Sequence, residues 1–342
     1  IEQFQPHSLN EHLVNGRPWD LDRTYGGLRL LQPFKGTNEG GWHQGNADAL
    51  YRNRHLIRQF EPDVLLVLSA DHVYKLDYRT VIDAHLAQNA HVTMVTTQVA
   101  RAEASRFGNV RVENNKVTHF AYKPDEPISD IVTTEVFVYN PEVILATLEH
   151  ISDAAEGDET GLKDFGDELL PQLVEAGHAY AFPLDGYWRD VGTIASYWQA
   201  HMDLLQATPP LVLDEPKWPI LTLGAPRLPA HIHASARIEN SLIASGCEVR
   251  GQVIDSVLAP GVIVAEGAVV RNSIIFNDTI IAANAEISYA IVDSQVAIGE
   301  RARIGGTPDI DNLDQGITLI GERAQIAAAA QIAMGSRIQP TS

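Results

Sequence analysis

The sequence contains a single cysteine, Cys247, and no apolar run near the roughly 20 residues of a membrane-spanning helix. One cysteine cannot form an internal disulfide, so a disulfide-stapled fold is excluded, and we expect a soluble, cytoplasmic protein with no membrane partner. Basic residues are also scarce, since 25 Lys and Arg stand against 44 Asp and Glu. The net charge of −19 repels polyanions and argues against a nucleic-acid partner. A small phosphorylated ligand, held by local cations or a metal, is compatible with this charge.

The 342 residues suffice for two domains, and the first 205 have the pattern of an α/β domain. Apolar runs predict strands, and stretches with apolar residues at helical spacing predict helices. Strands alternating with helices predict a mostly parallel sheet. The expected strands cover 64–69, 90–100 and 132–139, and the expected helices cover 8–14, 78–89, 141–151, 165–176 and 194–205.

Six prolines between residues 206 and 231 break any regular element, so this stretch is expected to be a linker. The remainder, 232–342, repeats itself. Four aligned tetrapeptides, beginning at Asn240, Asp255, Asn272 and Tyr289, are 15, 17 and 17 residues apart. Inside each unit the aliphatic residues recur every six positions, as in Leu258-Val264-Val270, and after an interruption at 305–316 the period returns. This spacing predicts a parallel β-helix, whereas a β-sandwich would alternate with a period of two.

Asp71 lies two residues beyond the end of the apolar run at 64–69. Ligands of open α/β sheets bind beyond the carboxyl ends of strands, so Asp71 is a candidate metal ligand; the alternative is a helix N-cap. A second candidate, Asp190, lies in the aromatic segment 187–193, whose Thr193 is positioned to cap the next helix. A divalent cation shared by Asp71 and Asp190 would satisfy both carboxylates, and Mg²⁺ suits a phosphoryl or nucleotidyl transfer site.

Two further segments carry weaker signals. Lys123 precedes Pro124, which is expected to hold its backbone extended, and its ammonium group is a candidate for phosphate binding, although such a lysine is often merely solvated. Residues 42–49 form a glycine turn before an expected helix whose amide end faces a ligand, unless the segment is a plain loop.

These segments, in this order before a hexapeptide β-helix, resemble the ADP-glucose pyrophosphorylase family of glucose-1-phosphate adenylyltransferases. The resemblance covers nearly the whole chain. The matching segments are residues 2–9 (family Q-Y-x-x-H-S-L), 42–49 (W-Y-x-G-T-A-D-A), 69–74 (G-D-H-x-Y), 107–108 (F-G), 123–124 (the end of E-K-P), 164–166 (D-F-G), 187–193 (Y-W-x-D-V-G-T) and 218–220 (W-P-I).

The resemblance implies a Rossmann-like nucleotidyltransferase domain at 1–205 and a left-handed β-helix of hexapeptide repeats at 232–342. It implies that a sugar 1-phosphate attacks the α-phosphorus of a nucleoside triphosphate, such as ATP with glucose 1-phosphate, in glucan biosynthesis. It further implies a homotetramer. The roles carried over are Mg²⁺ binding by Asp71 and Asp190, sugar phosphate binding by Lys123, nucleotide binding by Trp42, Gly45 and Asn46, and sugar binding by Gly108, Tyr122, Thr133 and Glu135.

Some positions depart from the family pattern. The family's glycine-rich G-G-x-G-T-R-L loop is absent and the chain starts at Ile1, so we expect upstream sequence to be missing and this polypeptide alone to bind nucleotide poorly. Tyr122 and Glu135 replace a Glu and a Gly on the sugar side, which leaves another hexose phosphate open. His43 and Gln44 replace the usual Tyr and a frequent Arg, which weakens the assignment of adenine.

Two other functions stay open. A non-catalytic regulatory or structural subunit would keep the β-helix while its active site drifts, and the intact Asp71, Lys123 and Asp190 count against it. An acyltransferase would use His231 or His233 as its base, but a solvated loop histidine beside Pro229 is the simpler interpretation.

Overall fold

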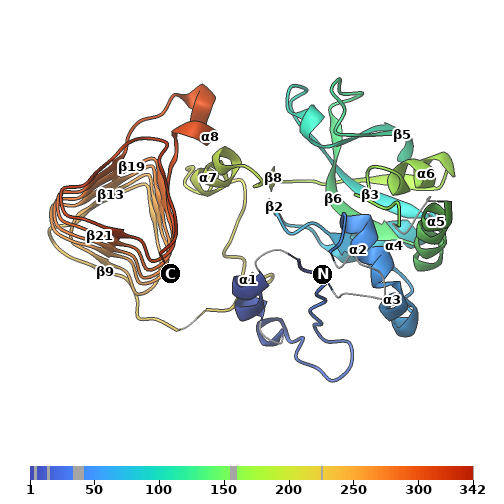
Figure 1. The fold of residues 1–342 in the computed structure, drawn as a ribbon, viewed down its shortest axis with the longest axis horizontal. Coiled ribbons are helices and arrows are strands. Elements are labelled where there is room, and N and C mark those ends of the chain that lie inside the picture. Colours follow the sequence, from blue (N-terminus) through green and yellow to red (C-terminus); the bar gives the residue numbers. More distant parts are fainter. Residues whose placement is uncertain (4–5, 14–15, 34–41, 155–159, 225, 342) are drawn as a thin grey trace. The chain divides into compact units, whose positions relative to one another are not determined.

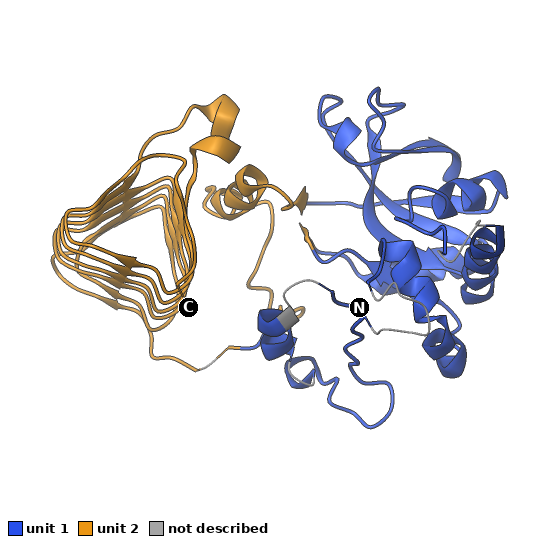
Figure 2. Cartoon of the chain, in the orientation of Figure 1, with its two compact units in different colours: residues 1–70, 75–188, 221–223 blue, residues 71–74, 189–220, 224–342 orange. Residues whose placement is uncertain are grey.

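The computed structural model describes residues 1–342 except 4–5, 14–15, 34–41, 155–159, 225 and 342. The chain forms two compact units, drawn in blue and orange in Figure 2. Unit 1 comprises residues 1–70, 75–188 and 221–223, and unit 2 comprises residues 71–74, 189–220 and 224–342. No helix among the described residues is long and apolar enough to cross a membrane.

Unit 1 is an α/β fold around a six-stranded sheet in the order β1-β6-β3-β7-β5-β4 (Figure 1). Its strands are β1 (Leu65–Leu68), β3 (Val92–Gln98), β4 (Gly108–Glu113), β5 (Lys116–Tyr122), β6 (Ile131–Tyr139) and β7 (Ala179–Pro183). Its helices are α1 (Pro6–Leu13), η1 (Arg17–Trp19), α2 (Asn46–Arg52), α3 (Arg54–Phe60), α4 (Tyr78–Ala87), η2 (Ala104–Arg106), α5 (Pro141–Ala154) and α6 (Leu169–Glu175). The helices and strands predicted for residues 1–183 are confirmed in type, with Val14 of the first helix outside the described residues.

Helices cover both faces of this sheet. Met94 of β3 is fully buried in a core with apolar residues of α2, α5 and α6. Its neighbour Thr93 points to the other face, because successive side chains alternate along a strand, and its hydroxyl lies 3.0 Å from Nδ1 of His85 in α4. The apolar side of each of these helices thus faces the sheet, as the helical spacing of apolar residues in the sequence indicated.

The prediction of a mostly parallel sheet is wrong. Among the described pairings of this sheet, β3–β7 is parallel, whereas β1–β6, β3–β6, β4–β5, β4–β6 and β5–β7 are antiparallel. The reason is a hairpin that the sequence analysis missed. β4 and β5 are joined at Asn114-Asn115, both with positive φ as in a type I′ turn, and β6 then returns without a helical crossover.

The β-helix of unit 2 is confirmed. Its strands stack as three parallel six-stranded sheets that form the triangular coil in Figure 1. The predicted aliphatic residues lie over one another: Leu258 pairs with Ile275 and Ile275 with Val292, and all three are almost fully buried. The sheets are β9 (His231–Ile232), β12 (Glu248–Val249), β15 (Ile263–Val264), β18 (Ile280–Ile281), β21 (Ala297–Ile298) and β24 (Gln325–Ile326); β10 (Arg237–Glu239), β13 (Gln252–Ile254), β16 (Val269–Arg271), β19 (Glu286–Ser288), β22 (Arg303–Gly305) and β25 (Gln331–Ile332); and β11 (Leu242–Ile243), β14 (Val257–Leu258), β17 (Ile274–Ile275), β20 (Ala290–Val292), β23 (Thr318–Ile320) and β26 (Arg337–Ile338).

Three further parts of unit 2 bear on the site. The predicted interruption of the repeat holds η3 (Ile310–Asn312) and α8 (Leu313–Gly316). Helix α7 (Ile194–Asp203) packs on the β-helix, where Nε1 of Trp198 donates to the carbonyl of Asn272 at 2.8 Å. Residues 189–220, which include α7, belong to unit 2. A two-stranded sheet joins β2 (His72–Tyr74) to β8 (Trp188–Asp190).

Candidate active site

Unit 1 contains an open cavity of about 700 Å³, a size typical of small-ligand sites. It lies along β1, β6 and the start of α2. The predicted residues that line it are Gly45, Asn46, Gly108, Tyr122, Thr133 and Glu135. Trp42 and Lys123 are described but are not among the lining residues, and Asp71 and Asp190 belong to unit 2. One cavity thus collects six of the eight nucleotide and sugar positions inferred from sequence.

The nucleotide side of the cavity is held by the D-F-G segment. Gly45 passes so close to it that a Cβ at this position would lie 2.2 Å from the carbonyl carbon of Lys163. Oδ1 of Asn46 accepts from the amide of Phe165 at 2.6 Å, and the Asn46 amide donates to Asp164 at 3.3 Å. The start of α2 therefore binds this chain's own residues, and the expectation that its amides face a ligand is wrong for Asn46.

Asp48 explains why the turn before α2 is ordered. Its side chain is fully buried, and its carboxylate accepts from the amide of Gln44 at 3.0 Å, from Nε of Arg52 at 2.8 Å and from the hydroxyl of Thr160 at 2.7 Å. Paired in this way, the buried charge fixes the loop that carries Gly45. The sequence analysis quoted Asp48 within its motif but gave it no role.

His43 also lines the cavity, and both of its ring nitrogens are buried without a hydrogen-bond partner in the described part of the chain. Burial lowers the pKa of His43, and the Asp48 carboxylate opposes this only in part. The ring is therefore neutral near pH 7. A neutral imidazole presents one donor and one acceptor, which suits a heteroaromatic ring such as a nucleobase.

The sugar side of the cavity combines a small residue with a buried hydroxyl. A Cβ on Gly108 would lie 2.8 Å from Oγ1 of Thr133, so the close approach of the Gly108 backbone to this hydroxyl favours a glycine. Glu135 lies where the register of β6 against β3 shifts, and its φ of 55° falls in the left-handed region. A glycine adopts that conformation without strain, and the family's motif has glycine at this position.

Lys123 ends β5 in surroundings that the sequence did not predict. Its φ is 42°, so the expectation that Pro124 holds it extended is wrong; its amide donates to the carbonyl of Phe107 at 3.2 Å. Its Nζ lies 4.9 Å from the centre of the Tyr122 ring, whose hydroxyl donates to Asp164 at 3.2 Å. Burial lowers the pKa of Lys123, but a hydrogen bond with Tyr122 and the charges of Glu135 and Asp164 raise it overall. The ammonium group is therefore charged and bordered by carboxylates.

In unit 2, Asp71 and Asp190 converge. β2 and β8 pair side by side, and the amide of Val191 donates to the carbonyl of Asp71 at 2.9 Å. Nε2 of His72 lies 3.6 Å from Oδ1 of Asp71 and 4.0 Å from Oδ1 of Asp190. Each carboxylate thus has an oxygen within 4.0 Å of the same imidazole nitrogen, and the sharing of one cation by Asp71 and Asp190 stays a prediction.

A local hydrogen bond holds the carboxylate of Asp190. Oδ1 of Asp190 accepts from the amide of Gly192 at 2.8 Å, and Thr193 caps α7 as predicted. Asp71 precedes a strand, so the alternative that it caps a helix is wrong. His72 is the residue that the sequence analysis missed, although it stands beside Asp71 in the quoted motif.

Comparison with known proteins agrees with this fold. Residues 1–207 match the model of the nucleotidyl transferase family, and residues 228–321 match that of the GlmU-like C-terminal hexapeptide family. The chain therefore belongs to the nucleotidyl transferases, with a hexapeptide β-helix after the transferase part.

Its curated relatives narrow the family. A glucose-1-phosphate adenylyltransferase of Acetivibrio thermocellus is 37% identical over 99% of this chain and 81% of its own length. Enzymes of the same name from Thermosipho melanesiensis and Thermotoga neapolitana are 39% and 40% identical over 79% of this chain, and the matches span 65% and 64% of those proteins. The chain belongs to the glucose-1-phosphate adenylyltransferase family, which implies a nucleoside triphosphate, a sugar 1-phosphate and a divalent metal.

Proposed function

We propose that this protein transfers the adenylyl group of ATP to glucose 1-phosphate, giving ADP-glucose and pyrophosphate for glucan synthesis. A phosphate oxygen of the sugar attacks the α-phosphorus, the bond from that phosphorus to the bridging oxygen breaks, and pyrophosphate leaves with the electron pair. The convergence of Asp71 and Asp190 around His72 carries this proposal. The names of the curated relatives support the substrate pair.

The donor set of this site fits Mg²⁺. Hard cations of this kind take carboxylate oxygens and keep several waters, and the carboxylates of Asp71 and Asp190, each within 4.0 Å of Nε2 of His72, are ligands of that type. Bound Mg²⁺ would neutralise negative charge at the α-phosphate. We assign Asp71 and Asp190 as its ligands. His72 is a positioning residue between them, since imidazole is a poor ligand for Mg²⁺.

Lys123 would bind the phosphate of the sugar 1-phosphate as a point charge. Its raised pKa keeps the ammonium group protonated, and Tyr122 orients it through the ring contact and the shared Asp164. Gly108 and Thr133, which line the cavity, would bind the sugar hydroxyls. Glu135 lines the same cavity and would border the sugar, and its negative charge would weaken the attraction of Lys123 for the sugar phosphate.

Trp42, Gly45 and Asn46 would bind the nucleotide, with Gly45 allowing the base to approach the backbone. The side-chain oxygen Oδ1 of Asn46 already accepts a hydrogen bond from the amide of Phe165. Its side-chain nitrogen Nδ2 is therefore the group that would bind a ligand. Trp42 is 62% exposed and would stack on the base from outside the cavity. A cytoplasmic homotetramer is part of the same proposal.

One observation favours a second function, that of a non-catalytic subunit. The carboxylates of Glu135 and Asp164 act on Lys123 directly and would repel an incoming phosphate. Such a subunit would keep the fold and bind sugar phosphate weakly.

Pyrophosphate release from the complete gene product distinguishes the two functions. The assay pairs each of ATP, GTP, UTP and dTTP with each of glucose, galactose and mannose 1-phosphate, with Mg²⁺ present. We expect turnover with ATP and glucose 1-phosphate to exceed that of every other pair. Preference for another pair would replace the substrate assignment, and absence of turnover with all pairs would support the subunit.

A further inference from the structure

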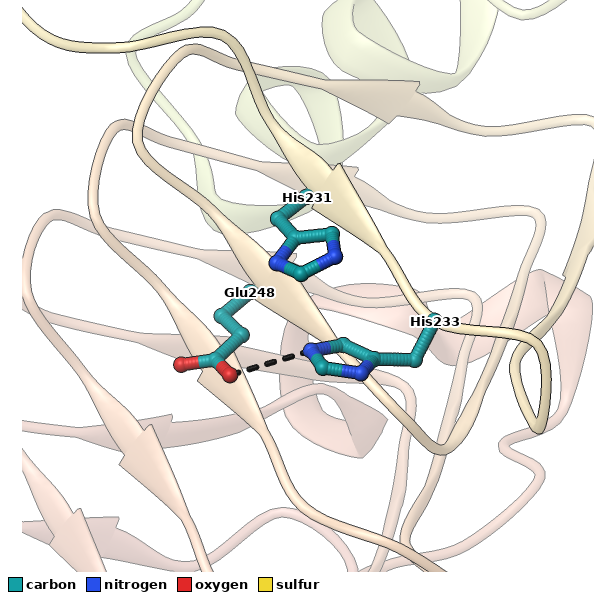
Figure 3. A group of neighbouring side chains, drawn as sticks. All are labelled: His231, His233 and Glu248. Atoms are coloured by element: carbon teal, nitrogen blue, oxygen red, sulfur yellow. Dashed lines mark hydrogen bonds and ion pairs between the residues drawn. The ribbon is translucent and has the colours of Figure 1, made fainter.

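The first coils of the β-helix carry a group of side chains that the transferase reaction does not use. His231 and His233 flank Ile232 at β9, and Glu248 lies on β12 in the next coil (Figure 3). One ligand atom from each of the three lies within 4.8 Å of the other two. We propose that these side chains bind a transition-metal ion of the Zn²⁺ type, separate from the catalytic metal.

The backbone brings the three side chains to one outward face. β9 and β12 pair in parallel with His231 opposite Glu248, and residues opposite each other in a sheet point the same way. His233 is two residues beyond His231 and shares its face, whereas Val249 points inward and is fully buried. The amides of His231 and His233 donate to the carbonyls of Cys247 and Val249 at 2.8 and 2.9 Å. The ladder thus positions the side chains before any ion binds.

The donor chemistry selects the class of metal. Two neutral imidazoles and one carboxylate form a ligand set typical of Zn²⁺, with a water in the fourth position of a tetrahedron. Mg²⁺ and Ca²⁺ prefer all-oxygen sites, so they are expected to bind poorly here. In the structure Nε2 of His233 already lies 3.0 Å from Oε1 of Glu248. Small rotations of the side chains would open this pair around an ion.

Two contacts within this group of side chains oppose binding of the metal ion, and one of them gives a further test. A guanidinium nitrogen of Arg250 forms an ion pair with the same Oε1 of Glu248. The rings of His231 and His233 are stacked with centroids 4.1 Å apart, a geometry that an ion would change. Because Arg250 competes for the carboxylate and repels a cation, its removal should tighten metal binding.

The position of the site implies a structural consequence. β9 is the last strand of its sheet, in the order β24-β21-β18-β15-β12-β9, and it pairs with β12 through two residues at each strand. An ion bound by His231, His233 and Glu248 would cross-link this edge strand to the next coil. Binding to the folded coil stabilises it by mass action.

Zn²⁺ binding to the full chain tests the proposal. The chain should carry the substitution Asp71→Asn, so that the acidic groups around His72 do not contribute a second site. Competition with a chromophoric chelator should give one Zn²⁺ per chain. We expect His233→Asn to weaken this binding at least tenfold, and Arg250→Ala to strengthen it severalfold.

Three controls keep the result interpretable. His119→Asn, a change of a histidine on β5 of unit 1, should leave Zn²⁺ affinity unchanged. Co²⁺ bound in place of Zn²⁺ should give the visible absorption of tetrahedral coordination, and this absorption should disappear in His231→Asn. Circular dichroism would verify that each variant is folded. Unchanged Zn²⁺ stoichiometry and affinity in folded His231→Asn and His233→Asn would overturn the proposal.

Discussion

Glu135 combines two costs that a glycine would avoid. Its φ of 55° is a conformation that costs a side-chain-bearing residue about 1–2 kcal/mol, and its carboxylate acts on the ammonium group of Lys123. We therefore expect Glu135→Gly to stabilise unit 1 by up to about 1 kcal/mol, after the larger chain entropy of glycine is subtracted. We also expect a lower KM for the sugar phosphate. Urea unfolding and steady-state kinetics measure the two effects.

Glu135→Ala separates strain from charge. It keeps a Cβ in the left-handed conformation and removes the carboxylate, so KM should fall while the gain in stability should be absent. If Glu135→Ala and Glu135→Gly stabilise the protein equally, the backbone at this position is not strained. If neither variant lowers KM, Glu135 does not weaken phosphate binding by Lys123.

The predictable part of the site consists of residues tied to short motifs. Asp71 comes shortly after an apolar strand and Asp190 precedes a helix cap, as the sequence indicated, whereas the short strands β2 and β8 beside them were not predicted. The surroundings of Lys123 did not follow. Its positive φ and its acidic neighbours depend on the contact between β5 and the D-F-G segment, which lie far apart in the sequence.

Helix α7 has a reciprocal cap that the sequence indicated in part. Oγ1 of Thr193 accepts from the amide of Ser196 at 3.1 Å, and the Ser196 hydroxyl accepts from the amide of Thr193 at 3.1 Å. Loss of such a cap costs about 1 kcal/mol. We expect Thr193→Ala to speed hydrogen exchange of the α7 amides several-fold, whereas Thr193→Ser should not. Equal exchange in Thr193→Ala and the parent protein would mean that packing on the β-helix alone holds α7.

Helix α4 makes stability depend on pH through His85. Burial lowers the pKa of His85, and the nearby His91 lowers it further. The unfolded chain, with a histidine pKa of about 6.5, therefore binds more protons than the folded chain as the pH falls below that value. Stability is retained above pH 6.5 and lost as the pH falls through the unfolded and then the folded pKa. Urea unfolding at pH 8 and pH 5.5 measures this loss.

The variant His85→Leu should lose less stability between the two pH values, because the substitution removes one titrating group. Leucine is similar in size to histidine, so the packing is kept. His201 in α7 also has a pKa lowered by burial, so part of the pH dependence should persist. An identical loss in the variant and the parent protein would contradict the role assigned to His85.

Sheet direction is the element-level feature that the sequence did not predict. Strand and helix positions followed from apolar periodicity, which local residues determine. Pairing direction depends on which strands meet. Because the β4–β5 hairpin precedes β6, β6 enters the sheet antiparallel to β3 and β4, without the helical crossover that a parallel strand would need. The pair Asn114-Asn115, both with positive φ, is a hairpin signal that a closer analysis of turns would have used.

The whole chain was predictable where it repeats. Residues six apart in each β-helix unit lie on successive faces of one coil, and the equivalent residues Val264, Ile281 and Ile298, each 17 positions apart, pair in register in successive coils. The division into units was less predictable. α7 has the composition of the transferase part, yet Trp198 and the amide of Ala195 bind to residues of the β-helix part. Such a partner choice depends on contacts that no local pattern contains.

The two units also organise the proposed chemistry. The cavity for nucleotide and sugar lies in unit 1, and the candidate metal ligands lie in unit 2, where the chain leaves unit 1 after Ala70 and after Trp188. Asp71 is joined directly to Ala70, which lines the cavity. Substitutions at Asp71 or Asp190 should therefore act on turnover with little effect on the core of either unit.

The most direct test is turnover of ATP and glucose 1-phosphate by Asp190→Asn over a range of Mg²⁺ concentrations. The substitution keeps the size of the side chain and removes its charge. We predict that kcat falls at least about 100-fold and that half-saturation needs at least about tenfold more Mg²⁺. The exposed Asp185→Asn serves as the matched control and should behave as the parent protein. Parental kcat and Mg²⁺ dependence in folded Asp190→Asn would contradict a metal site shared by Asp71 and Asp190.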